Sequence, residues 1–102
     1  MKELKANELK EFIQNGNVAI DFWATWCGPC KMLGPIFEEI SNELENINFA
    51  KADMDEVGEE AMTFGVKGVP TIILFKNGEE ITRIVGAQPK DALKTQIQEA
   101  FN

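Results

Sequence analysis

The only two cysteines of the chain, Cys27 and Cys30, are separated by Gly28 and Pro29. A disulfide between them closes so small a loop that it removes little conformational entropy from the unfolded chain, and it would stabilise the fold only weakly. If Cys27 caps a helix and Cys30 is its third residue, both side chains lie on one face. Their Cα atoms then fall within the range of about 4.4 to 6.8 Å that a disulfide requires. The spacing therefore favours a bond that opens and closes over a structural one.

The expected position at a helix start also predicts different roles for the two thiols. The N–H groups of a first helical turn and the helix dipole favour an anion, so we expect Cys27 to form the reactive thiolate. Cys30 lies one turn deeper and should be less exposed. These residues predict dithiol–disulfide exchange, in which Cys27 attacks a substrate disulfide and Cys30 then attacks Cys27 to release the reduced product.

Three other uses of a cysteine pair are weaker alternatives. A zinc site needs about four ligands, whereas the chain has two cysteines and no histidine, so two chains would have to share the metal. An iron–sulfur cluster would have to be bridged between two chains in the same way. Two inert buried thiols are a further alternative, which Trp26 and the intervening Gly28 and Pro29 disfavour. No metal is therefore expected.

Composition indicates one globular domain over residues 1–102, with 44% hydrophobic and 26% charged residues. The formal net charge of −7 disfavours nucleic-acid binding, which depends on Lys and Arg neutralising phosphates. No apolar run approaches the roughly 20 residues of a membrane span, so no membrane contact is expected. The first ten residues, MKELKANELK, are charged and have no apolar segment. We therefore expect no secretory signal and a cytoplasmic location.

Short β-like runs alternate with helical segments along the chain. The predicted strands are residues 2–5, 18–24, 47–53, 71–76 and 81–85. Run 18–24 is almost wholly apolar, as expected of a central strand covered on both faces. Asn77-Gly78 is a preferred two-residue hairpin turn, which predicts antiparallel pairing of the last two strands. Alternating strands and helices in the first half predict parallel crossovers. The fold class is α/β, a central mixed sheet of about five strands with helices on both faces.

Helices are predicted between and after these strands. Asn7 is expected to cap the first one, and Gly16 to end it. A second helix begins at the cysteines, and its apolar face consists of Leu33, Ile36, Phe37, Ile40 and Leu44. A third is predicted over residues 57–64, and Pro89 is expected at the first position of a closing helix.

These motifs together resemble the thioredoxin family. WCGPCK at residues 26–31 follows VAIDFWA at 18–24. Further matching segments, extending over nearly the whole chain, are KAD at 51–53, FGVKGVPT at 64–71, LFKNG at 74–78 and VGA at 85–87. A lone C-x-x-C is a weak signal, whereas this ordered set at family spacing is specific. The resemblance implies the thioredoxin fold and a thiol–disulfide oxidoreductase that reduces disulfides in other proteins.

The resemblance also implies a role for each residue at the thiols. Cys27 corresponds to the exposed nucleophile and Cys30 to the resolving thiol. Asp21 corresponds to a buried carboxylate that accepts or relays the proton of Cys30, with Lys51 nearby. Independently of the family, an aspartate inside an apolar strand is desolvated, which raises its pKa toward that of a working base. The alternatives are an Asp21 at a strand end or on a polar face, and a Lys51 that is only a solvated charge at a strand end.

A substrate surface is implied by the same resemblance. It consists of Trp26, Gly28, Pro29, Val69, Pro70, Gly86 and Ala87. The Val69–Pro70 bond is expected to be cis because of the resemblance alone. A cis turn opposite the thiols would leave the Val69 backbone free to pair with an extended substrate segment.

Partners and rival functions follow from this interpretation. The expected partners are disulfide-containing substrate proteins and a thioredoxin reductase that recharges a monomer; no cofactor is expected, because the Cys27–Cys30 pair itself holds the electrons. A disulfide oxidase or isomerase is one rival, and the intervening Gly28 and Pro29 disfavour it, since they offer no cation to stabilise the thiolate. The other rival is an interaction module that uses the Trp26 and Val69 surface and in which redox turnover is incidental.

Overall fold

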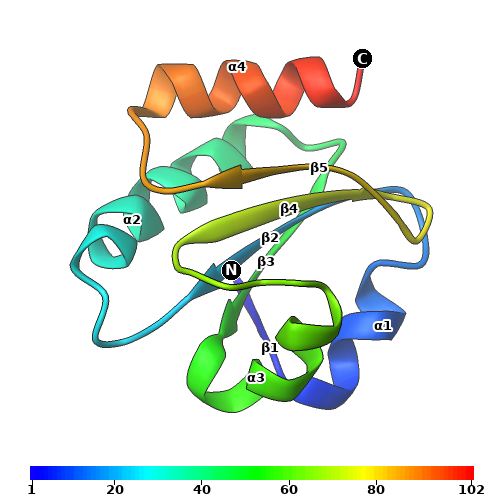
Figure 1. The fold of residues 1–102 in the computed structure, drawn as a ribbon. Helices are drawn as coiled ribbons and strands as arrows, with labels where there is room; N and C mark the ends of the chain where they lie inside the picture. The colour runs from blue at the N-terminus through cyan, green and yellow to red at the C-terminus, as the bar shows by residue number, and fades with distance from the viewer.

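The computed structural model describes residues 1–102 and contains one five-stranded sheet (Figure 1). The strands are β1 (Lys2–Leu4), β2 (Asn17–Trp23), β3 (Asn48–Asp53), β4 (Thr71–Lys76) and β5 (Glu79–Val85), in the order β1-β3-β2-β4-β5. β1 and β2 are both parallel to β3, whereas β4 is antiparallel to β2 and to β5. The predicted mixed sheet is confirmed.

Helices cover both faces of this sheet (Figure 1). They are the 3₁₀ turn η1 (Ala6–Glu8) and the helices α1 (Leu9–Phe12), α2 (Gly28–Glu43), α3 (Met54–Thr63) and α4 (Lys90–Ala100). α2 and α4 pack on one face, and α1 and α3 pack on the other. None of the helices has both the length and the apolar character that crossing a bilayer would require.

The sheet separates two hydrophobic cores because successive side chains of a strand point to opposite faces. In β2, Val18, Ile20 and Phe22 pack into the core beneath α1 and α3, and Ala19 packs into the core beneath α2 and α4. Asp21 lies two residues after Ala19 and therefore points to the same face of the sheet as Ala19. The pleat of β2 therefore directs the only acidic residue of this strand toward α2.

Two helix starts differ from the prediction. Asn7 does not cap a helix, because the first helical turn begins at Ala6 and Asn7 lies within it. Here the carboxylate of Glu8 accepts the backbone N–H of Lys5 at 2.8 Å. α3 begins at Met54, where the Asp53 side chain caps it by accepting the N–H of Asp55 at 2.9 Å. The helix is kinked at Val57, the residue at which it was predicted to begin.

Two further boundaries differ near the C-terminal end of the chain. Pro89 is the N-cap of α4, not its first helical residue, since its ψ of 150° is extended. β5 begins at Glu79, two residues earlier than predicted, directly after the turn. The turn residues Asn77 and Gly78 have positive φ angles of 50° and 90°, which is the backbone of the predicted hairpin turn.

Candidate functional site

Cys27 and Cys30 lie at the start of α2 and are joined by a disulfide. Cys27 is the N-cap residue and Cys30 the third helical residue, as predicted. Their Cα atoms are 5.3 Å apart. The backbone N–H of Cys30 donates a hydrogen bond to the Sγ of Cys27 at 3.2 Å. In the reduced protein, this donor and the helix dipole would both stabilise a thiolate on Cys27.

Both cysteines are largely covered by the protein. Cys27 exposes 6% of its surface and Cys30 exposes 3%. The pair packs with Ala24, and Val69 and Trp23 lie against this small cluster. The order of exposure agrees with the prediction, but Cys27 is less exposed than predicted because it is packed from two sides. A substrate disulfide must therefore approach the small part of Cys27 that still contacts solvent.

An exposed rim surrounds the cysteines. The Trp26 side chain next to Cys27 is 70% exposed. Gly28 and Pro29, between the cysteines, are also exposed. Pro29 is compatible with the first turn of α2, where a backbone N–H has no helical partner to lose. This rim leaves an apolar surface free beside the disulfide.

The loop that faces the disulfide contains a cis Val69–Pro70 bond, as the family resemblance predicts. Val69 is half-buried against the cysteine cluster, and Pro70 is buried. The carbonyl of Pro70 accepts the backbone N–H of Gly86 at 2.9 Å. This bond brings Gly86, followed by the exposed Ala87, to the Val69–Pro70 loop. The structure thus connects the three predicted segments of the substrate surface.

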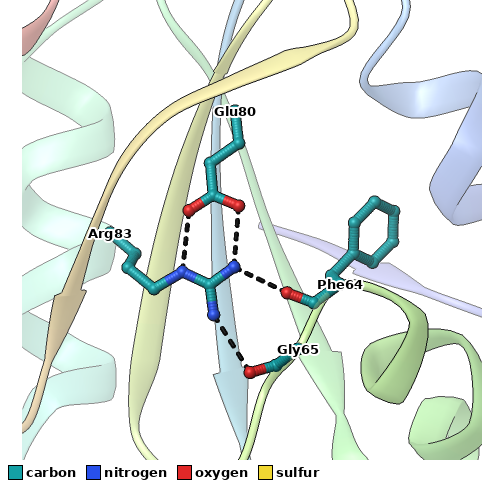
Figure 2. Close-up of polar contacts among 4 residues, drawn as sticks. All are labelled: Phe64, Gly65, Glu80 and Arg83. Atoms are coloured by element: carbon teal, nitrogen blue, oxygen red, sulfur yellow. Dashed lines mark hydrogen bonds and ion pairs between the residues drawn. The ribbon is translucent and has the colours of Figure 1, made fainter.

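Arg83 of β5 holds the chain at the start of this loop (Figure 2). Its guanidinium donates to both carboxylate oxygens of Glu80, each at 2.7 Å. It also donates to the carbonyls of Phe64 and Gly65, at 2.6 and 3.1 Å. These carbonyls follow the last turn of α3, where backbone acceptors lack helical partners. Sequence reasoning missed Arg83, since an arginine on a strand belongs to no recognisable motif.

Asp21 is fully buried, and neither oxygen of its carboxylate has a hydrogen-bond partner. Desolvation raises the pKa of this carboxyl to about 7. The positive charge of Lys51 opposes the rise, and the negative charge of Glu3 adds to it. The sequence-based prediction of a desolvated carboxylate is confirmed, and the polar-face alternative is excluded.

Lys51 lies next to Asp21, because the two residues pair in register between β2 and β3. Its Nζ is 4.6 Å from the centroid of the Trp23 ring, within cation–π range. The lysine is half-buried, so it is not the fully solvated charge of the alternative. Lys51, Trp23 and Cys30 line one surface pocket of about 340 Å³ together with residues of α2. The structure therefore places the predicted lysine in register with Asp21 and in a pocket that Cys30 also lines.

Comparison with known proteins supports the family resemblance that the sequence motifs indicate. The sequence profile described as Thioredoxin matches residues 1–99. A thioredoxin of Chlamydia caviae is 43% identical over 93 residues, which cover 91% of each chain. A thioredoxin of Mycobacterium bovis is 49% identical over 86 residues, which cover 83% of this chain and 74% of the relative. The crystal structure of Malassezia sympodialis thioredoxin superimposes with a TM-score of 0.89 and 39% identity, covering 100% of this chain and 91% of the other.

Proposed function

The chain belongs to the thioredoxin family, and from this premise we propose that it reduces protein disulfides by dithiol–disulfide exchange at Cys27 and Cys30. The observation that carries this function is the position of Cys27 at the N-cap of α2. There its Sγ accepts a backbone N–H and is joined to a second thiol one turn away. This arrangement supports both a nucleophilic thiolate and its rapid intramolecular resolution.

In the first step, the thiolate of Cys27 attacks one sulfur of a substrate disulfide. A bond forms between Cys27 and that sulfur, the substrate S–S bond breaks, and the other substrate sulfur leaves as a thiolate that takes up a proton. The product is a mixed disulfide between enzyme and substrate. Since Cys27 is 6% exposed, this step requires the substrate to lie in close contact with the rim around it.

In the second step, Cys30 loses its proton and attacks the Sγ of Cys27. The bond between Cys27 and the substrate breaks, and the second substrate sulfur leaves and is protonated. Two electrons have then passed to the substrate, and the protein has the Cys27–Cys30 disulfide that the structure contains. These electrons come from the two sulfurs of the reduced Cys27–Cys30 pair, so this scheme uses no cofactor.

We assign Asp21 as the base that accepts or relays the proton of Cys30. Its support is a buried carboxylate without hydrogen-bond partners, on the side of the sheet that α2 covers, with a pKa of about 7. A base with this pKa is about half ionised at neutral pH, which suits proton transfer in both directions. Lys51 is proposed to assist by stabilising the ionised form of Asp21.

We assign substrate binding to the rim and the loop opposite the disulfide. The rim supplies Trp26, Gly28 and Pro29, and the loops supply Val69, Pro70, Gly86 and Ala87. The support is their position around Cys27, together with an exposed aromatic ring that provides apolar contact area. An extended substrate segment beside Val69 would present its disulfide to Cys27.

Each turnover leaves the protein oxidised, so a second partner has to return two electrons to it. We propose a thioredoxin reductase for this role, acting on a single-domain monomer. A reducing function further suggests a cytoplasmic location, because cytosolic conditions keep dithiols reduced.

The proposed function is tested by equilibrating the Cys27–Cys30 pair with glutathione or dithiothreitol buffers of known potential. A reductant should remain largely oxidised in buffers that fully reduce a strong disulfide oxidant, and about 30 mV corresponds to a tenfold change in the equilibrium constant. Reduction of insulin disulfides by the full chain should accompany this result. A reduction potential of the Cys27–Cys30 pair in the range of disulfide oxidants would favour the oxidase or isomerase instead. Full biological activity of a Cys27→Ser/Cys30→Ser double variant would favour the interaction module.

A further inference from the structure

Three charged residues form one row across the three parallel strands. Glu3 of β1 pairs in register with Lys51 of β3, and Lys51 pairs in register with Asp21 of β2. The neighbours Leu4 and Ile20 point into the core beneath α1 and α3. Because side chains alternate along a strand, the three charged residues lie on the opposite face, beneath α2. Lys51 is therefore placed between two carboxylates.

Trp23 connects two neighbours of this row, Glu3 and Lys51. Its indole N–H donates a hydrogen bond to Oε2 of Glu3 at 3.0 Å. The face of the same ring lies 4.6 Å from the Nζ of Lys51. Glu3 therefore holds the aromatic ring against which the ammonium group packs. Glu3 influences the position of Lys51 through this ring as well as through its charge.

Asp21 depends on charges at a distance, because no hydrogen bond satisfies its carboxylate. From the sheet, Lys51 lowers the pKa of Asp21 and Glu3 raises it. From α2, Lys31 and Glu38 line the adjoining pocket, and Glu38 is paired with the N-terminal amino group at 3.6 Å. On the other side of Asp21, β4 contributes the uncharged Ile72. Glu3 is thus the acidic group that acts on Asp21 from within the sheet.

We propose that Glu3 is a positioning residue that sets the pH range over which Asp21 accepts a proton from Cys30. It does so by opposing the charge of Lys51 and by holding the Trp23 ring against the Lys51 ammonium. This role rests on the proposed function of Asp21. Glu3 lies on a short edge strand and touches neither thiol, and its effect on the reaction is exerted through Lys51 and Asp21.

The two parts of this role can be separated by two substitutions. Glu3→Gln removes the charge and keeps an oxygen that can accept the indole N–H, whereas Glu3→Ala removes both. Glu11→Gln is the matched control, since Glu11 is an exposed acid on α1, at the opposite face of the sheet. The Asp21 carboxyl carbon is titrated by NMR in the oxidised protein, which requires no turnover.

Glu3→Gln should lower the titration midpoint of Asp21 by about half a pH unit, because one repulsive charge is lost in a partly screened environment. In reduction assays, the acid limb of the pH–rate profile should move in the same direction and by a similar amount. Glu3→Ala should shift both at least as far, and Glu11→Gln should shift neither.

Unchanged midpoints in both Glu3 variants would overturn the proposal. A shift in Glu3→Ala alone would also overturn the charge effect, and would leave Glu3 as a packing residue for Trp23. A wild-type protein that titrates as described but reduces no disulfide would instead contradict the proposed function, so the two failures are distinguishable.

Discussion

The backbone N–H of Cys30 donates to the Sγ of Cys27 over 3.2 Å, across a single turn of α2. This relationship makes Cys27 both the cap of the helix and the preferred site of negative charge once the disulfide is reduced. It also explains why the two thiols are not equivalent. Cys30 lies inside the first turn and receives no comparable backbone donor from its own helix start.

Serine substitutions should separate the two thiols. Cys27→Ser should abolish disulfide reduction, because no nucleophile remains at the cap. Cys30→Ser should form the mixed disulfide with substrate and fail to resolve it, so that a covalent complex accumulates. Non-reducing electrophoresis and intact mass measurement detect that complex. Normal turnover by Cys30→Ser would contradict the assigned roles.

Because Asp21 is buried, the folded protein should become less stable as the pH rises. The carboxyl has a pKa of about 7 in the folded protein, against an ordinary value of 3.8 for an aspartate in the unfolded chain. Between these values the folded protein binds a proton that the unfolded chain has lost, so the free energy of unfolding decreases with increasing pH. The full loss is about 4 kcal/mol, reached above pH 7.

Asp21→Asn should remove this dependence. Urea unfolding of the oxidised variant should give a free energy of unfolding that no longer falls as the pH rises across this window. The variant should be more stable than the wild type at pH 8, by up to about 4 kcal/mol. The same variant should reduce disulfides more slowly near neutral pH. Equal stability of both proteins at pH 8 would show that the buried carboxylate carries no penalty.

Lys51→Gln should shift the pH dependence of the proton transfer in the opposite direction from Glu3→Gln. Loss of the positive charge raises the pKa of Asp21, so the acid limb of the pH–rate profile should shift to higher pH. Reduction rates measured from pH 5 to 9 test this. Lys10→Gln, an exposed lysine on α1, is the control. A profile that coincides with that of the wild type would remove Lys51 from the mechanism.

Arg83 should stabilise the loop that faces the disulfide. Hydrogen bonds to charged groups contribute about 1.5 to 3 kcal/mol to stability. The Arg83 side chain is 30% exposed, which weakens its contribution through solvent screening. Arg83→Ala should therefore lower the free energy of unfolding by about 1 to 2 kcal/mol. Arg83→Lys keeps the charge and loses the forked geometry, and it should recover only part of this loss.

Hydrogen exchange distinguishes this effect from a general loss of stability. In Arg83→Ala, the amides of residues 65–69 should exchange faster relative to the wild type, while those of the sheet change little, because the carbonyls of Phe64 and Gly65 lose their partner. Lys67→Ala, on the same loop, is the control. Uniform acceleration over all strands would argue against a local role for Arg83.

Several elements could be predicted closely from sequence. β4 has the predicted bounds, and the Asn77-Gly78 turn joins it to β5 as expected. The capping position of Cys27 and the buried state of Asp21 were also predictable. Each of these rests on a signal within a few neighbouring residues, such as an apolar run, a turn dipeptide or a helix start. The cis state of Val69–Pro70 followed from family resemblance alone.

The misplaced helix starts have a local cause as well. Asn7 and Asp53 both have side chains that can cap, and composition does not show which backbone N–H each one reaches. In the structure, Asp53 caps α3 and Asn7 caps nothing, while Glu8 satisfies the turn before α1.

By itself the sequence determined the chemistry: two thiols at a helix start, a carboxylate inside an apolar strand, and the alternation of strands and helices. Only the tertiary structure decided which distant residues act on that chemistry. Glu3 reaches Trp23 across 20 positions, and Arg83 reaches Phe64 across 19. Strand order and register create these contacts, and a charge acts on whatever folding brings near it, regardless of separation along the chain.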